Sequence, residues 1–455
     1  MNLLRQMEQY QGEAIWYQGA SITYPQLLEQ AEMMVKMWGG ERQLIALKAH
    51  HHPDTIVIYL AALLGRHPLI LINPKLDEQS QQAIIESYQP NWGYFERGQS
   101  GVSLHTKPHN LDPELALLLT TSGSTGGVKL VQLSLANLSA NAASIADYLQ
   151  MDCHSRVISA LPLAYSYGLS LLNSHLWCGG SMVLTEPDPM RRDFWQLLKE
   201  QGVTQLAGVP YSYQMYEQLR IRRNDWPDLQ VLTQAGGHLD RKLAQTFAQW
   251  ASAQGKDFCV MYGQTEATAR IAYVPAGEVL SRPDSIGVAI PGGELMIVDE
   301  QGQPLLDDNQ EGELVYRGAN VMLGYAQTLS DLAKPSRPGV LKTGDLGYRD
   351  ADGFFYVTGR LKRMIKLAGT RTALDALERT LSTPELPVVC CGHDDALRIA
   401  VTSTEHVLDV EKHLREQLGL HPRLFAVACI ESLPHTANGK LDYPRLAQWI
   451  EHDGS

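Results

Sequence analysis

The segment from Leu117 to Val131 constrains this chain more than any other, because two apolar runs flank a loop of Thr, Ser and Gly. It reads Leu-Leu-Leu-Thr-Thr-Ser-Gly-Ser-Thr-Gly-Gly-Val-Lys-Leu-Val, and its first run is typical of a buried strand. Glycines let a backbone approach phosphate oxygens closely, successive backbone N–H groups form an anion nest, and Lys129 adds a positive charge. A flexible hairpin turn has the same composition. The loop by itself favours phosphate binding over a plain turn, and both interpretations stay open.

The loop is not a Walker A motif, which closes with Gly-Lys-Ser/Thr onto a helix, because Lys129 is followed by a return to apolar sequence. It resembles the signature of the adenylate-forming superfamily, which includes acyl-CoA synthetases, peptide-synthetase adenylation domains and luciferases. The match departs from the family at Val128 and Leu130, where Pro and Gly are usual, and neither position would supply a donor side chain. The residues that the resemblance assigns to ATP are Thr121, Ser122, Gly123, Ser124, Thr125, Gly126 and Lys129.

Composition and charge limit the class of protein. The chain has 455 residues, of which 44% are hydrophobic, so it can bury a large core divided between two or three domains. A formal net charge of -12 disfavours nucleic acid as a partner. The polar N-terminus shows no secretory signal, and the apolar stretch Ile56–Ile72 is interrupted, so we expect no membrane span. Six cysteines at unrelated spacings indicate reduced core thiols and no metal site, which favours a cytoplasmic location.

Hydrophobic periodicity alternates between strand and helix in the first part of the chain. It predicts strands at Ala14–Tyr17, Gln43–Lys48 and Pro68–Ile72. Between them it predicts helices at Tyr24–Trp38 and Asp54–Leu64. Strands that alternate with helices indicate a layered α/β architecture.

A second motif, Met261-Tyr262-Gly263-Gln264-Thr265-Glu266, extends the resemblance. It assigns Tyr262 to stacking on adenine, Thr265 to donating to the α-phosphate, and Glu266 to holding Mg²⁺ through oxygen. A glutamate at a strand end is usually a solvated charge, but the ordered match after the phosphate loop makes that interpretation the weaker one. The other residues that the resemblance assigns to the nucleotide are Gly263, Gln264 and, from an Ala-Gly-Gly turn, Gly236, Gly237 and His238.

The segment Leu161–Leu169 stands where the superfamily opens onto its acyl pocket. Tyr165 occupies the place of an aromatic or His residue, whereas Tyr167 is as compatible with ordinary core packing as with the pocket. No acidic residue lies between Ser159 and Gly180 to pair with a substrate ammonium, and an unpaired buried charge is costly. An amino-acid substrate is therefore disfavoured. The predicted acid-binding residues are Tyr165, Tyr167, Gly168, Tyr211 and Ala235.

Three further matches lie in the last third of the chain. The run ending in Asp345 resembles the family's Thr-Gly-Asp motif, which assigns Asp345 to the ribose hydroxyls and Arg360 to ribose or phosphate. The run from Gly359 to Lys362 resembles the family's hinge, which implies domains at 1–359 and 360–455. The turn before Leu441 resembles the terminal catalytic loop and makes Lys440 the catalytic lysine, although a Gly-Lys turn near a C-terminus is most often solvated.

Beyond the hinge the periodicity again mixes helices and strands. It predicts helices at Leu374–Leu381 and Val407–Leu418, and strands at Pro387–Cys391, Leu397–Thr402 and Leu424–Ile430. The expected fold is α/β, with a large N-terminal domain of layered α/β sheets and a smaller, mobile α+β C-terminal domain.

The resemblance implies an ATP- and Mg²⁺-dependent acid–thiol ligase of the acyl-CoA synthetase type. Lys440, Glu266 and Thr265 would convert an aryl or short- to medium-chain carboxylic acid into an acyl-adenylate and release pyrophosphate. The acyl group would then pass to a thiol with release of AMP, and both CoA and the phosphopantetheine of an acyl carrier protein acting in trans stay open as acceptors. The alternatives are an amino-acid-activating ligase and a non-catalytic nucleotide-binding homologue. The presence of Lys129, Glu266, Asp345 and Lys440 argues against the second.

Overall fold

The computed structural model describes residues 2–120, 129–186, 188–383, 386–435 and 441–452. The chain forms two compact units, one made of Met1–Leu295 and Tyr316–Leu341, the other of Met296–Val315 and Lys342–Ser455. The last crossing between the units therefore precedes the predicted hinge at 359–362. That residues 359–362 act as a hinge stays a prediction.

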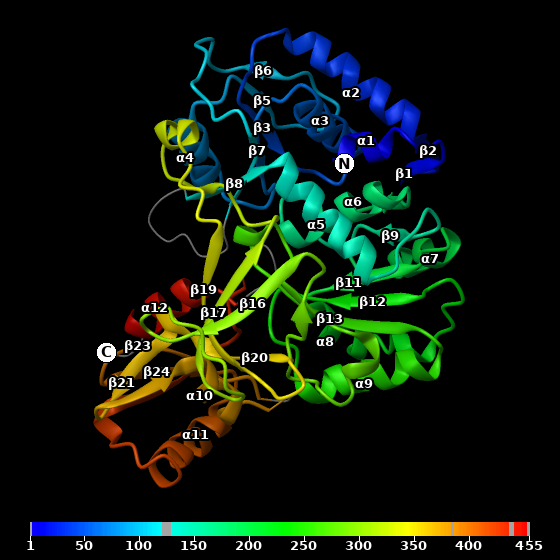
Figure 1. The fold of residues 1–455 in the computed structure, drawn as a ribbon. Coiled ribbons are helices and arrows are strands. Elements are labelled where there is room, and N and C mark those ends of the chain that lie inside the picture. Colours follow the sequence, from blue (N-terminus) through cyan, green and yellow to red (C-terminus); the bar gives the residue numbers. More distant parts are fainter. Residues whose placement is uncertain (1, 121–128, 187, 384–385, 436–440, 453–455) are drawn as a thin grey trace. The chain divides into compact units, whose positions relative to one another are not determined.

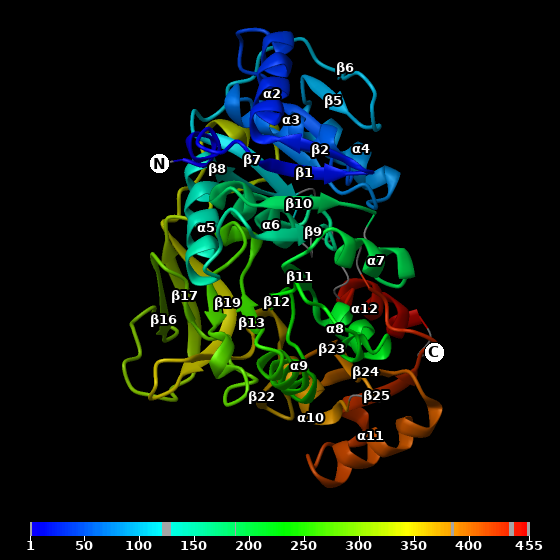
Figure 2. The ribbon, with the colours of Figure 1, turned by 90° about the vertical axis from the view of Figure 1, so that its right-hand side faces the viewer.

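The first unit contains a nine-stranded sheet. Its pairs are parallel in the middle and antiparallel at both edges. The strands are β1 (Glu13–Tyr17), β2 (Ala20–Thr23), β9 (Arg156–Ile158), β10 (Ser181–Leu184), β11 (Gln205–Gly208), β12 (Val231–Gln234), β13 (Asp257–Tyr262), β14 (Ala272–Val274) and β15 (Val288–Ala289). Their order is β15-β14-β13-β12-β11-β9-β10-β1-β2, and Figure 2 shows β1, β10 and β9 side by side.

A seven-stranded sheet completes the strand framework of this unit. Its strands are β3 (Ile45–Lys48), β4 (Leu69–Ile72), β5 (Trp92–Tyr94), β6 (Val102–Ser103), β7 (Leu115–Thr120), β8 (Leu130–Ser134) and β18 (Gly324–Ala326). Their order is β18-β8-β7-β4-β3-β5-β6. The predicted phosphate loop lies between β7 and β8, as the two apolar runs indicated.

Helices cover both sheets of the first unit (Figure 1). They are α1 (Leu3–Met7), α2 (Tyr24–Trp38), α3 (Pro53–Leu64), α4 (Glu78–Tyr88), α5 (Leu135–Tyr148), α6 (Ser166–Cys178), α7 (Arg192–Glu200), α8 (Pro210–Gln218) and α9 (Arg241–Ala253). Short 3₁₀ turns are η1 (Ile221–Arg223), η2 (Thr265–Ala267), η3 (Ala276–Glu278) and η4 (Leu329–Ala333).

Alternate residues of one strand contact different helix layers, which is the expected consequence of the two-residue strand period. Phe258 of β13 packs on Tyr213 of α8 and Phe247 of α9. Its neighbour Cys259 belongs to the main core, which also includes the apolar faces of α5 and α6. Helix α3 is buried almost all round, because its residues between Pro53 and Leu63 are nearly all apolar. The layered α/β prediction is confirmed, and the helix Tyr24–Trp38 has the predicted bounds.

The second unit is smaller and mixes helices with short sheets. Its helices are α10 (Leu374–Leu381), α11 (Thr404–Glu416) and α12 (Tyr443–His452), with turns η5 (Leu361–Arg363) and η6 (Pro422–Leu424). Its strands are β20 (Phe355–Arg360), β21 (Met364–Leu367), β22 (Thr370–Ala373), β23 (Val389–His393), β24 (Ala396–Val401) and β25 (Phe425–Cys429). The division between units runs through β16 (Gly293–Val298), β17 (Gly312–Gly318) and β19 (Val340–Arg349), which with β20 form a four-stranded sheet in the order β16-β17-β19-β20.

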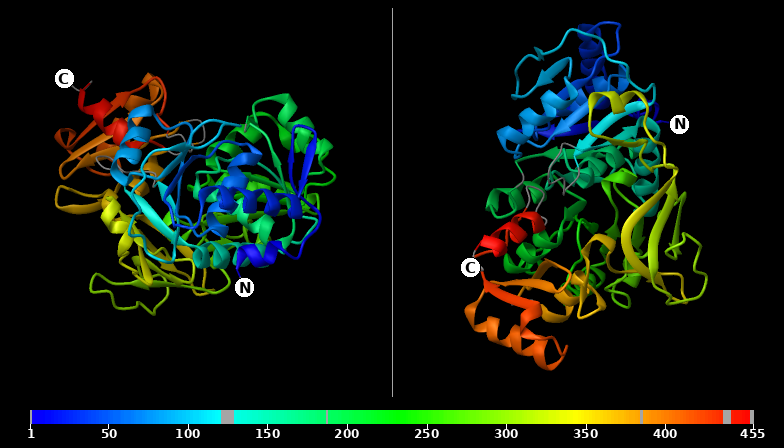
Figure 3. Two further views of the ribbon diagram at one scale, coloured as in Figure 1. Left: turned by 90° about the horizontal axis from the view of Figure 1, so that it is seen from above. Right: turned by 90° about the vertical axis from the view of Figure 1, so that its left-hand side faces the viewer.

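The three-stranded sheet β23-β24-β25 has a helix layer on each face (Figures 1 and 3). Cys390 packs with Leu414 of α11, whereas the adjacent Cys391 packs with Leu446 of α12. The predicted helix Leu374–Leu381 has the expected bounds. Within the ranges that the structure describes, no helix is both long and apolar enough to cross a membrane.

Candidate active site

Lys129, Tyr325 and Glu266 form a chain of contacts in the first unit. Lys129 directly precedes β8, and Tyr325 lies opposite Val131 in the antiparallel β18–β8 pair. The ammonium of Lys129 lies 3.3 Å from the centroid of the Tyr325 ring. The hydroxyl of Tyr325 donates a hydrogen bond to Oε1 of Glu266 at 2.9 Å. Tyr325 thus connects the lysine and the glutamate that the sequence predicted for the phosphate side of the site.

The electrostatics of this contact chain favour an anion and a hard cation as ligands. Burial and the adjacent Glu266 carboxylate both raise the pKa of Tyr325 well above its ordinary value, so its hydroxyl remains a donor at neutral pH. The ring face compensates part of the Lys129 charge. The carboxylate of Glu266 has two oxygens, and one hydrogen bond leaves capacity for a cation. Lysine can neutralise phosphate while a carboxylate holds a hard cation beside it.

Thr265 and Glu266 lie on η2, which directly follows β13. The hydroxyl of Thr265 donates to Oγ of Ser166, the first residue of α6, at 3.3 Å. Gln264, the residue before η2, donates through Nε2 to the hydroxyl oxygen of Tyr262 at 3.3 Å. The motif residues therefore form one local hydrogen-bonded turn next to the start of α6.

The turn after η2 is strained. Thr268 has φ 65° and ψ -57°, and the amide of Ala269 donates across it to the carbonyl oxygen of Ala267 at 2.7 Å. This geometry is a γ-turn of the rare, strained kind, and a β-branched residue seldom adopts positive φ. Such a conformation costs about 1–3 kcal/mol and persists only where neighbouring groups hold it.

Asn320 holds this turn. Its Nδ2 donates to the carbonyl oxygens of Ala267 and Arg270, each at 2.8 Å. Its own carbonyl oxygen accepts from the hydroxyl of Thr268 at 2.8 Å. Tyr316, whose pKa burial raises to about 12, donates to Oδ1 of Asn320 at 2.8 Å. Asn320 is buried, so these bonds are shielded from water and stabilise the turn that carries Glu266.

Tyr165 and Tyr167 lie at the start of α6 and are both buried. Their rings meet edge to face with centroids 6.2 Å apart. The hydroxyl of Tyr167 donates to the carbonyl oxygen of Thr233 at 2.9 Å, so only its ring face could serve a ligand. Gly236, with φ 90°, lies so close to Tyr165 that an added Cβ would be 2.5 Å from the hydroxyl oxygen. The Ala-Gly-Gly turn therefore lies against the predicted acid pocket.

The remaining residues predicted for the first unit differ in exposure. Ala235 is buried, whereas Gly237 and His238 are exposed. Gly168 packs its Cα against backbone, since an added Cβ would lie 2.1 Å from a carbonyl oxygen of the loop before α6. Tyr211, in the first turn of α8, is 54% exposed.

In the second unit, Asp345 and Arg360 form an ion pair. They lie opposite each other on β19 and β20, with Nε of Arg360 3.1 Å from Oδ1 of Asp345. The Asp345 side chain is buried and that of Arg360 is exposed. The structure thus brings together the two residues that the sequence assigned separately to ribose and to ribose or phosphate. The predicted residues Thr121, Ser122, Gly123, Ser124, Thr125, Gly126 and Lys440 lie outside the described residues.

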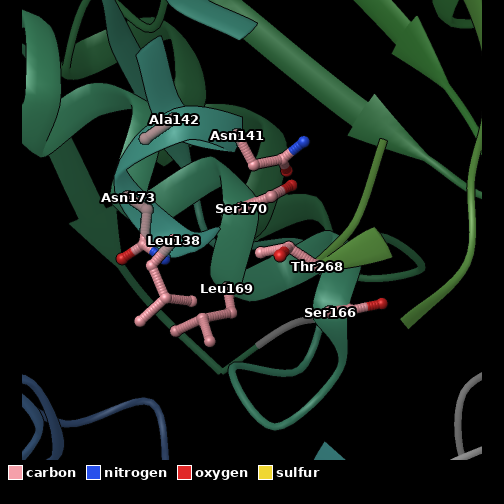
Figure 4. A pocket seen from close by; sticks show the side chains of 8 residues that line it. All are labelled: Leu138, Asn141, Ala142, Ser166, Leu169, Ser170, Asn173 and Thr268. Carbon is pink, nitrogen blue, oxygen red and sulfur yellow. The ribbon is translucent and has the colours of Figure 1, made fainter. Parts of the chain in front are cut away.

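A small cavity is lined in part by Ser166 (Figure 4). Side chains of α5 and α6, together with Thr268, line it, and its volume is about 10 Å³. That volume holds about one water molecule, which excludes a nucleotide or an acid. The lining includes Asn141, whose Oδ1 has no hydrogen-bond partner among the described residues.

Three residues of the site were not anticipated from the sequence: Tyr325, Asn320 and Arg270. Tyr325 and Asn320 follow β17 in a segment that folds back onto η2. No periodicity links that segment to Glu266. The sequence did mark Arg270 as unusual, because it is the charged residue within the otherwise uncharged run Ala267–Val274.

Comparison with known families identifies the family of this chain. A model of the AMP-binding enzyme family matches residues 89–326, which is more than half of the chain. The chain belongs to the AMP-binding enzymes. The predicted adenylate-forming superfamily is therefore confirmed, and with it the prediction of an enzyme. The matched range contains Lys129, Glu266, Asn320 and Tyr325.

Individual members of this family resemble the chain at modest identity. An anthranilate–CoA ligase of Pseudomonas aeruginosa is 28% identical over 84% of this chain and 74% of its own length. An indoleacetate–CoA ligase of Aromatoleum aromaticum is 26% identical over 77% of this chain and 70% of its own. Among solved structures, o-succinylbenzoate CoA synthetase of Bacillus subtilis, in complex with ATP and magnesium ion, superposes with a TM-score of 0.79 at 22% identity. That match covers 99% of each chain and shows a shared fold with a large N-terminal and a small C-terminal domain.

Proposed function

We propose that this enzyme is an AMP-forming acid–thiol ligase that converts a carboxylic acid into an acyl-adenylate and then into a thioester of CoA. The observation that carries the proposal is the contact chain of Lys129, Tyr325 and Glu266, within the range that the family model matches. CoA is preferred as acceptor because the two sequence relatives are CoA ligases by name. Transfer to a carrier-protein phosphopantetheine is the alternative acceptor.

In the proposed first step, a carboxylate oxygen of the acid attacks the α-phosphorus of ATP. A phosphorus–oxygen bond forms, the bond to the bridging oxygen breaks, and pyrophosphate leaves with that electron pair. Both reactants are anions, so positive charge must be supplied before they meet. Lys440 is assigned to the carboxylate and bridging oxygen, and Lys129 to the departing pyrophosphate. In the second step a thiol attacks the acyl carbon, its proton is released, and AMP leaves.

Glu266 is the residue that would hold Mg²⁺. Its carboxylate is partly exposed, and among the described residues no cluster of three or more potential metal ligands forms. One or two protein carboxylates together with substrate phosphates are the usual ligand set of Mg²⁺, so this single carboxylate fits. When bound, the ion would neutralise phosphate charge. Tyr325 orients the carboxylate by its hydrogen bond.

The remaining predicted roles belong to this proposal. Tyr262 is assigned to adenine, and Asp345 with Arg360 to ribose. The domains 1–359 and 360–455 would change their arrangement between the two steps, with the hinge at Lys362. This change of domain arrangement would keep water away from the labile adenylate, which water would hydrolyse, and would admit the thiol.

The acid is proposed to be an aryl acid or a short- to medium-chain acid. Support comes from the buried rings of Tyr165 and Tyr167 and from Gly236, which packs closely on Tyr165. Aromatic faces favour flat or apolar groups. An amino acid is disfavoured by the lack of an acidic residue between 159 and 180.

A screen for pyrophosphate release tests the function directly. The purified protein with ATP and Mg²⁺ is offered aryl, fatty and amino acids, each with and without CoA. We expect pyrophosphate release with at least one aryl or short- to medium-chain acid, and AMP turnover that rises when CoA is added. Release with amino acids only would favour the alternative ligase. ATP binding without release for any acid would favour a non-catalytic homologue.

Changes at Glu266 and Tyr325 should alter the Mg²⁺ requirement. Glu266→Gln removes the anionic ligand, so the Mg²⁺ concentration for half-maximal adenylation should rise at least about 10-fold, equivalent to about 1.4 kcal/mol. Tyr325→Phe keeps the carboxylate but removes its hydrogen bond, and should shift the same curve by a smaller factor. The exposed Glu294→Gln is the control. An unchanged Mg²⁺ curve for Glu266→Gln would show that this glutamate is only a surface charge.

Lys440→Ala should separate the two half-reactions. Loss of the positive charge at the reacting carboxylate should slow adenylation at least about 100-fold, the effect typical of one electrostatic group. Binding of ATP and conversion of a supplied acyl-adenylate to thioester should continue. Lys412→Ala, on the exposed face of α11, is the control. Normal adenylation by Lys440→Ala would refute the role given to this lysine.

A further inference from the structure

Arg270 is a charged side chain in the interior of the first unit. It lies between η2 and β14, is 2% exposed, and ranks among the largest fully buried side chains of the described chain. Removing a guanidinium from water costs several kcal/mol unless a counter-ion and hydrogen bonds replace the solvent. A buried arginine therefore requires compensation from its surroundings.

The contacts of the guanidinium supply only part of that compensation. Its Nε donates to the sulfur of Met261 at 3.3 Å, which is a weak acceptor. Its Cζ lies 3.9 Å from the centroid of the Tyr167 ring. The Tyr148 hydroxyl is near enough for the cation to oppose the rise of the Tyr148 pKa that burial causes. Across the described part of the chain, none of the ion pairs with a carboxylate includes Arg270.

These contacts leave the balance unfavourable. A desolvated cation–π contact offsets only part of what burial of the ion costs. A guanidinium has donors on three nitrogens, and sulfur with one hydroxyl occupies a minority of them. Most of its donors therefore have no acceptor among the described residues. An anion able to accept more than one hydrogen bond would complete the set of partners.

The position of Arg270 indicates which ligand could supply that anion. Its cation lies on the ring of Tyr167, one of the two buried tyrosines assigned to the acid pocket, and it also lowers the pKa of Tyr165 against the effect of burial. The residues assigned to the phosphate side, Lys129 and Glu266, contact a different tyrosine, Tyr325. Arg270 thus belongs to the acyl side, away from the contact chain assigned to pyrophosphate and Mg²⁺.

We propose that Arg270 binds a second carboxylate on the substrate, so that the acid activated by this enzyme is a dicarboxylic acid. One carboxylate is adenylated, and the other accepts paired hydrogen bonds from the guanidinium, whose planar fork matches carboxylate geometry. This inference rests on the proposed function for the reaction, but the recognition of the diacid can be measured without turnover. Tyr167 positions the guanidinium through its ring while its own hydroxyl stays bonded to Thr233.

The test compares matched pairs of acids: hexanoate with adipate, and benzoate with isophthalate. Binding of each acid to the intact protein is measured by calorimetry without ATP, and adenylation by pyrophosphate exchange. We expect the wild type to bind the diacid of at least one pair about 10-fold more tightly than its monoacid. Arg270→Met, of similar length but uncharged, should abolish or invert that preference, and Arg270→Lys should retain part of it. Arg241→Met, which removes an exposed arginine paired with Asp284, should leave the preference unchanged.

A structural role for Arg270 predicts different results. Replacing an uncompensated buried ion by an apolar side chain is often neutral or stabilising, so Arg270→Met should keep or raise Tm. A large fall in Tm together with an unchanged diacid preference would assign Arg270 to packing and overturn the proposal. Equal binding of both members of every pair by the wild type, or binding of neither, would also overturn it. Pyrophosphate exchange with monoacids only would uphold the ligase function and reject the diacid proposal. Diacid binding without pyrophosphate exchange would uphold recognition of the diacid and reject the ligase function.

Discussion

Gly263→Ala should destabilise the first unit and abolish ATP-dependent turnover. The chain after β13 doubles back so tightly that a Cβ on Gly263 would lie 1.8 Å from the carbonyl oxygen of Ala269 and 2.8 Å from the Cα of Arg270. Both contacts are with backbone, which cannot rotate away as a side chain could. Displacing the strained turn should cost at least about 3 kcal/mol, and Tm should fall by roughly 5–10 °C in thermal unfolding.

A matched substitution separates this clash from the general effect of adding a methyl group. Gly277, on η3, has no atom within 4 Å of an added Cβ, and its φ is not positive. Gly277→Ala should therefore leave Tm unchanged or raise it slightly, because it restricts the unfolded chain. Similar Tm values for the two variants would mean that the main chain at Gly263 has room to relax.

Asn320→Ala should have the second largest effect, because one side chain satisfies three buried groups. The substitution leaves the carbonyl oxygens of Ala267 and Arg270 and the hydroxyl of Tyr316 without these partners. The two carbonyl oxygens each keep one other donor, the amide of Ala269 and Nδ2 of Asn141, so only the hydroxyl of Tyr316 loses its partner entirely, and we expect a loss of about 2–4 kcal/mol. Release of the turn should also displace Glu266, and the KM for Mg-ATP should rise at least about 10-fold in the exchange assay.

Tyr316→Phe provides a graded comparison for this prediction. It removes the donor to Oδ1 of Asn320 but keeps both bonds from Nδ2 to the turn. We expect a loss of about 1 kcal/mol with the KM for Mg-ATP nearly unchanged. If both variants lost stability equally while keeping the same KM, Asn320 would contribute to packing but not to the position of Glu266.

The sequence predicted the layered α/β architecture and the helices and strands at the start of the first unit. Helix α2 and helix α10 have the predicted bounds, because a long amphipathic period identifies a helix in one dimension. Several strand ends moved by one or two residues; the strand predicted to begin at Gln43, for example, begins at Ile45. Strand ends depend on pairing with neighbours, and those neighbours are distant in sequence.

The ordered motifs that include Lys129, Glu266 and Asp345 were sufficient to predict the superfamily from the sequence, because local motifs carry their chemistry in adjacent residues. Tertiary structure alone decided what surrounds them. Tyr325 reaches Glu266 across 59 positions, and Asn320 reaches the same turn across 53. Arg270 was visible as a charge in an apolar run, but only the folded chain shows it buried on Tyr167 with no carboxylate partner among the described residues. Contacts of this kind form between strands and turns that the sheet brings together, and neither periodicity nor a motif encodes which distant side chain fills the space.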